Sequence, residues 1–127
     1  MKTNSVIAGL GIVILCSTCA AILRAADQPP KYTVEEIMKA VFKGDDSTAK
    51  KVGQGKGTKE DLAKLGEYVE SLPANDAPQG DPAGWKKKTT AVVDAVSALK
   101  EEKPDALAQF KLATDCKSCH SVYRPTE

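Results

Sequence analysis

Histidine is nearly absent from the sequence: the 127 residues include only one, His120. This count excludes a metal centre that needs two histidines. It also excludes a mechanism in which one histidine binds a metal and a second acts as acid or base. Methionine is almost as rare, with only Met1 and Met38. Once an N-terminal leader is removed, a site that combines the two residue types has to use His120 and Met38.

Aromatic residues are also scarce, at 5% of the chain. They are Tyr32, Phe42, Tyr68, Trp85, Phe110 and Tyr123. A domain of about a hundred residues buries only a modest core, so a bound cofactor with an apolar face would supply much of the packing. Alternation of apolar and polar residues, which marks β-strands, is missing, and every apolar set follows the helical period. The sequence therefore predicts an all-α protein.

A long apolar run occurs at the N-terminus. It follows Lys2 and leads to a small residue, Ala25. This pattern is typical of a secretory signal peptide, here residues 1–25, which leaves a domain at residues 26–127 and predicts export to the periplasm. An uncleaved membrane anchor through residues 6–23 is the alternative, because that run is about as long as a short transmembrane helix.

The charges are nearly balanced, with 18 basic and 17 acidic residues. Removal of the leader takes away Lys2 and Arg24 and no acidic residue, so the domain stays close to neutral. We therefore expect no general attraction to nucleic acid.

The run Lys86–Lys88 could be a docking patch for an acidic redox partner. Consecutive residues fan around a helix, however, so a solvated face is the preferred interpretation.

Start and stop signals divide the domain into four main helices. Thr33 with Glu36, and Thr58 with Asp61, place capping residues just before apolar stripes. The expected helices cover residues 33–44, 58–72, 81–99 and 104–124. We also expect a short helical turn at residues 45–52, a flexible glycine-rich connector at residues 53–57, and a long crossover at residues 73–84 that overlaps the start of the third helix.

Cys116, Cys119 and His120 form C-x-x-C-H, the attachment signature of c-type haem. In a helix these positions share one face. Two thiols can then reach the two vinyl groups of one porphyrin while the imidazole reaches the iron. A redox dithiol, which needs only C-x-x-C, is the alternative. A zinc site would need a fourth Cys or His, which residues 26–127 lack. We therefore expect one covalently bound haem c.

This motif lies in the last predicted helix and the remaining methionine in the first, the reverse of the order in the commonest c-type cytochromes. The ending C-x-x-C-H-x-x-Tyr123-Arg124 and, more weakly, the segment Ile37-Met38-Lys39 resemble the class II cytochromes c. These are the family of cytochrome c-prime and its low-spin relatives.

The resemblance implies an antiparallel four-helix bundle, with haem attached to the last helix and held between the first and last helices. It implies that His120 is the proximal iron ligand and that Arg124 lies near the haem. In low-spin members a methionine at the place of Met38 is the distal ligand. Several class II members dimerise, so a homodimer is one alternative to a monomer.

Three functions remain open. The first is electron transfer to and from redox partner proteins, with iron held by His120 and Met38. The second is a five-coordinate haem that binds small gases such as nitric oxide or carbon monoxide, in which Met38 is only a packing side chain. The third is a non-haem thiol–disulfide protein that uses Cys116 and Cys119. A haem enzyme such as a peroxidase is not expected, because no second histidine remains as acid or base.

Overall fold

The computed structural model describes residues 29–126. The predicted signal peptide at residues 1–25 and the alternative anchor at 6–23 lie outside the described residues. All regular structure in this part of the chain is helical, which confirms the prediction of an all-α fold. Within the same range, no helix has both the length and the apolar character needed to cross a membrane.

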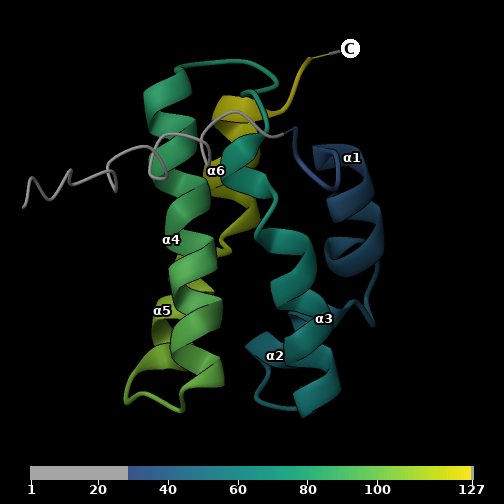
Figure 1. Cartoon of the computed structure of the whole chain (residues 1–127), viewed down its shortest axis with the longest axis vertical. Coiled ribbons are helices and arrows are strands. Elements are labelled where there is room, and N and C mark those ends of the chain that lie inside the picture. The colour runs from purple at the N-terminus through teal and green to yellow at the C-terminus, as the bar shows by residue number, and fades with distance from the viewer. Residues whose placement is uncertain (1–28, 127) are drawn as a thin grey trace, which may run out of the picture.

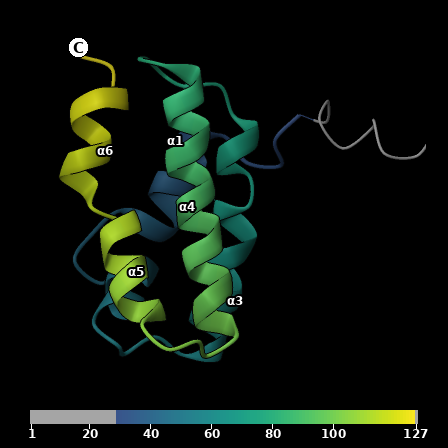
Figure 2. The same cartoon turned by 90° about the vertical axis from the view of Figure 1, so that its left-hand side faces the viewer.

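The elements in chain order are α1 (Val34–Ile37), the π-helix η1 (Met38–Phe42), α2 (Thr48–Gly53), α3 (Lys59–Val69), the 3₁₀ turn η2 (Leu72–Ala74), α4 (Pro82–Lys100), α5 (Ala106–Ala113) and α6 (Cys116–Tyr123). α4 is the longest helix, and it packs against α3 and α5 (Figure 1). In the views of Figures 1 and 2, α1 and α4 run down the molecule, whereas α3, α5 and α6 run up it. α1, α6 and the first half of α4 therefore lie at one end.

The predicted first helix is present, but it is not a uniform α-helix. Thr33 caps it in a reciprocal capping box with Glu36, as expected. From Met38 the chain continues as a π-helix, in which the backbone N–H of Lys43 donates to the carbonyl of Met38 at 2.8 Å. Gly44 then ends the helix with a φ of +97°, in the left-handed region that glycine adopts at little cost.

The second and third predicted helices agree closely with α3 and α4. Thr58 caps α3 in a second capping box, with Asp61 as its partner. Before α4, the side chain of Asp81 accepts a hydrogen bond from the backbone N–H of Gly84 at 2.7 Å, and Pro82 occupies the first helical position. These ends were predictable because the capping side chains act within four residues of the chain.

The prediction of one continuous last helix over residues 104–124 is wrong. The chain forms two helices, α5 and α6, separated at Thr114 and Asp115. The Thr114 hydroxyl donates to the carbonyl of Phe110 at 2.7 Å, and the extended Asp115 accepts from the backbone N–H of Lys117 at 3.2 Å. These short polar side chains compete with the helical backbone bonds and give α6 an N-terminus of its own. The cysteine motif therefore begins a helix instead of ending one.

The core lies between α1–η1, α3, α4 and α5. Its most completely buried large side chains are Phe110, Ile37, Leu65, Val41, Val69 and Val96. Within α1–η1 and within α3 the buried pairs are four residues apart, as expected on one face of a helix. By contrast, Val34, Met38 and Phe42 of α1–η1 are only partly buried.

Substitution of Phe110 tests this core. Phe110 is 1% exposed, whereas Leu112 on the same helix is 76% exposed. Phe110→Ala should lower the free energy of unfolding by about 3–5 kcal/mol, because it leaves a cavity among packed side chains. Leu112→Ala is the matched control and should change stability by less than about 0.5 kcal/mol. Urea unfolding of both variants measures the difference, and equal losses would contradict this description of α5.

Candidate cofactor-binding site

A cavity of about 960 Å³ lies between α1–η1, α4 and α6. Each candidate residue of the sequence analysis lines it: Met38, Cys116, Cys119, His120 and Arg124. Met38 and the C-x-x-C-H motif lie at opposite ends of the domain sequence, so only the fold brings them together. A concave site of this size, with apolar walls and a few polar groups, is typical of small-molecule and cofactor sites.

The walls of the cavity are mainly apolar. Their larger apolar side chains are Val34, Met38, Phe42, Leu72, Trp85 and Val92. The charged residues of the lining are exposed, with the exception of the partly buried Lys88. The cavity is therefore apolar inside and charged at its rim. Such a site suits a ligand with a large apolar body and a few polar groups.

One face of α1–η1 reaches the cavity. Val34, Met38 and Phe42 are four residues apart and all line it, whereas Ile37 and Val41 are fully buried in the core. Met38 begins the π-helix and also packs partly against the core cluster. π-helical segments are rare and often occur at functional sites. Met38 is thus both a packing residue and a wall of the cavity.

α6 presents the cysteine motif to the cavity from another wall. None of its residues is buried, although Cys119 and Tyr123 pack partly against the core cluster. Cys116 and His120 are exposed and Cys119 is partly buried. An isolated helix of eight residues is not stable in water. α6 therefore depends on its contacts across and around the cavity.

Two of those contacts hold the C-terminal half of α6. The ring of Tyr123 meets Trp85 of α4 edge to face, with centroids 5.3 Å apart. The side-chain amide of Gln79 donates to the carbonyl of Val122 at 3.2 Å. Gly84 leaves room for this approach, because a Cβ atom there would lie 2.5 Å from the Tyr123 hydroxyl. No pattern in the sequence predicts this close approach.

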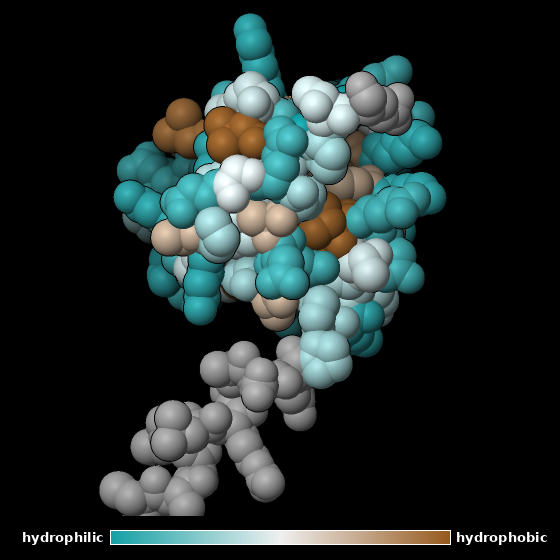
Figure 3. Space-filling model, turned by 90° about the horizontal axis from the view of Figure 1, so that it is seen from above, coloured by the Kyte–Doolittle hydropathy of each residue, from teal (hydrophilic) through white to brown (hydrophobic). Residues whose placement is uncertain are grey.

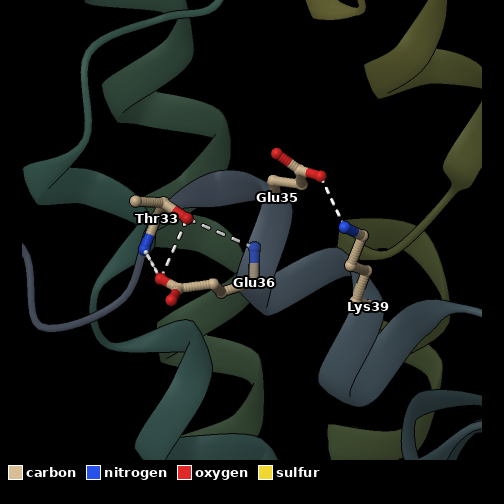
Figure 4. A network of polar contacts seen from close by, with 4 residues as sticks. All are labelled: Thr33, Glu35, Glu36 and Lys39. Atoms are coloured by element: carbon tan, nitrogen blue, oxygen red, sulfur yellow. Dashed lines mark hydrogen bonds and ion pairs between the residues drawn. The ribbon is translucent and has the colours of Figure 1, made fainter.

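An ion pair on α1–η1 lies at the rim of the cavity. The Lys39 ammonium donates to the Glu35 carboxylate one helical turn away (Figure 4). This hydrogen bond raises the pKa of Lys39 and lowers the pKa of Glu35. Lys39 therefore stays protonated near neutral pH. In this form its nitrogen has no lone pair with which to bind a metal.

The surface at this end of the molecule is mostly hydrophilic. Seen from above, the part formed by residues 29–126 shows hydrophobic residues only in small separate patches (Figure 3). The more strongly exposed large hydrophobic side chains in this range are Leu112 and Val122, from α5 and α6. The apolar surface of this end is thus largely turned into the cavity.

The two cysteines of the motif are not bonded to each other. Burial raises the pKa of the Cys119 thiol, and the nearby Lys88 lowers it by a smaller amount. A reactive thiol of a redox dithiol requires the opposite, a lowered pKa. Among residues 29–126, no group of three or more His, Cys, Asp or Glu side chains is arranged to hold a metal ion. Cys119 thus lacks the lowered pKa of an attacking thiol, and the described residues show no cluster for a bare metal ion.

Several wall residues were not predicted from the sequence. Trp85 and Val92 lie on α4, but nothing in the sequence indicated that their side of this helix faces a cavity. Lys88 was expected on a solvated face with Lys86 and Lys87. Lys86 and Lys87 are exposed, whereas Lys88 turns toward the cavity.

Comparison with known proteins finds no matching family model, no similar curated protein and no similar solved structure. The function therefore has to be inferred from the site itself.

The raised pKa of Cys119 can be tested by its reactivity. In haem-free Cys116→Ser protein, Cys119 should react slowly with iodoacetamide at pH 7, because burial keeps it protonated. The rate should rise with pH as the thiolate forms, and it should still be rising above the ordinary thiol pKa of about 8.5. Mass spectrometry of the alkylated protein over a range of pH measures this. A rate that levels off below that pH would contradict the raised pKa and would favour the thiol–disulfide alternative.

Proposed function

We propose that the protein is an exported c-type haem protein that transfers electrons between redox partner proteins. The supporting observation is that Met38 and the motif Cys116, Cys119 and His120 line a single apolar cavity. The motif alone is a pattern of five residues. The cavity adds what the motif requires, an apolar space beside the two thiols and the imidazole.

The residues present fit a covalent haem c. Cys116 and Cys119 would form the thioether bonds to the porphyrin, and His120 would be the proximal iron ligand. The apolar walls would cover the porphyrin faces, and the exposed charged rim would leave its polar groups near water. When bound, the haem supplies the one-electron Fe(III)/Fe(II) couple.

Met38 is the proposed distal ligand. It is the one methionine among residues 26–127, and it lines the cavity from α1–η1 while His120 lines it from α6. Histidine with methionine raises the reduction potential, and apolar surroundings raise it further. The ion pair with Glu35 makes Lys39, the adjacent basic residue, unsuited to replace it.

We propose the bundle of the class II cytochromes c for this chain. α1–η1, α3, α4 and α5–α6 would be its four antiparallel helices, with haem attached to the last of them. Arg124 ends α6 and lines the cavity, which suits a place near the haem. A homodimer is an alternative to a monomer, nucleic acid is not a proposed partner, and no enzymatic activity is proposed.

Covalent haem is the first test. Protein matured in a cell that attaches c-type haem should have an intact mass that includes one haem, and this mass should survive denaturation.

The ferric protein should be low-spin, and the reduced protein should resist carbon monoxide, because Met38 occupies the sixth position. Met38→Leu removes the sulfur and should give a high-spin protein that binds carbon monoxide.

Val34→Ile is the matched control, since Val34 lines the cavity one turn before Met38 and carries no donor atom. Its spectrum should remain low-spin. A mass equal to the bare polypeptide would contradict the haem proposal. High-spin, carbon monoxide-binding spectra for both the wild type and Met38→Leu would refute the ligand role of Met38 and favour gas binding.

Export to the periplasm is the second test. N-terminal sequencing of the protein made in its own cell type should show that the chain begins after Ala25, because a signal peptidase removes the leader. Membrane-bound protein that retains Met1 would instead favour the anchor through residues 6–23. Cytoplasmic protein that retains Met1 would contradict export.

A further inference from the structure

Lys88 is the partly buried charged residue of the cavity wall. Its ammonium donates to the hydroxyl of Ser118 at 2.7 Å, and that hydroxyl donates to the carbonyl of Asp115 at 3.0 Å. Ser118 lies between the two cysteines of the motif. A side chain of α4 is thereby connected through the motif to the residue that caps α6.

This hydrogen bond acts on the half of α6 that carries the cysteines. The contacts of Tyr123 with Trp85 and of Val122 with Gln79 hold the other half. Within residues 29–126, Lys88 provides the only side-chain hydrogen bond from another helix to the segment Cys116–His120. Since α6 buries no residue, the loss of this bond leaves the motif weakly held.

The charge of Lys88 has a second effect. None of the ion pairs among the described residues includes Lys88. Its positive charge therefore faces the cavity without a carboxylate partner, in a site less exposed to water than the rim. A charge in such a place acts more strongly than an exposed charge on the same helix.

We propose that Lys88 is a positioning residue for the haem-attachment motif: it holds α6 against α4 through Ser118 and places a fixed positive charge beside the bound haem. The electrostatic part of this inference rests on the proposed function, whereas the positioning part does not. A neighbouring positive charge favours ferrous over ferric iron, because reduction removes one positive charge. Lys88 therefore raises the reduction potential.

Hydrogen exchange of the full chain tests the positioning role. Lys88→Met removes the donor and the charge, and Lys88→Arg keeps both. Ser118→Ala keeps the charge of Lys88 but removes its acceptor, together with the hydroxyl's own bond to Asp115. Lys87→Met is the matched control, because Lys87 is the exposed neighbour on α4. Amides of α6 should exchange several-fold faster in Lys88→Met and Ser118→Ala, and at the wild-type rate in Lys88→Arg and Lys87→Met. Equal rates in Lys88→Met and Lys87→Met would overturn the positioning role.

Redox titration of the haem-loaded variants tests the charge. At a fixed solution potential, Lys88→Met should lower the ratio of reduced to oxidised protein several-fold, and Lys87→Met should lower it less because water screens its charge. Lys88→Arg should match the wild type. Equal shifts in Lys88→Met and Lys87→Met would overturn the electrostatic role.

Failure of this inference is distinguishable from failure of the proposed function. A chain that carries no haem, but whose α6 exchanges faster in Lys88→Met, contradicts the proposed function and supports the positioning role. A chain that carries haem, with α6 and the potential unchanged in Lys88→Met, overturns only the inference.

Discussion

The arrangement of the cysteine motif depends on the apolar cavity that lies beside α6. α1–η1, α3, α4 and α5 close a core in which Ile37, Leu65 and Phe110 are almost fully removed from water. α6 has no such residue, and it borders about 960 Å³ of mainly apolar space. Apolar walls exposed to water are unfavourable. An apolar group bound in the cavity would therefore also stabilise the position of α6, and with it the arrangement of the motif.

The parts of the fold that could be predicted are those set by residues near one another in the chain. Thr33, Thr58 and Asp81 each cap a helix through a side chain that reaches a backbone N–H three residues ahead. The cysteine motif was identifiable for a related reason, because attachment to one porphyrin edge requires its spacing. Met38 could be proposed by elimination, as the methionine left after the leader, and from the weaker resemblance of the segment around it to the class II cytochromes c.

The rest depends on competition or on distant contacts. No residue type marks the π-helix from Met38, and the break before α6 results from Thr114 and Asp115 competing with the helical backbone bonds. Lys88 points toward the cavity because α4 lies against α6, where its ammonium reaches Ser118. A run of three lysines in the sequence does not show which of them will do so. The cavity lies between α1–η1 and α6, a meeting that the resemblance implied but that spacing and periodicity do not predict.

Trp85 gives the cavity a built-in optical reporter. It is the single tryptophan of the chain, it is 4% exposed, and it lines the cavity with its indole N–H fixed to the carbonyl of Asn75 at 2.8 Å. Tryptophan fluorescence of this protein therefore reports the surroundings of Trp85 alone. A coloured group in the cavity would quench that emission by energy transfer, and unfolding would restore part of it. Binding of such a group in the cavity can therefore be followed by intrinsic tryptophan fluorescence, without an added label.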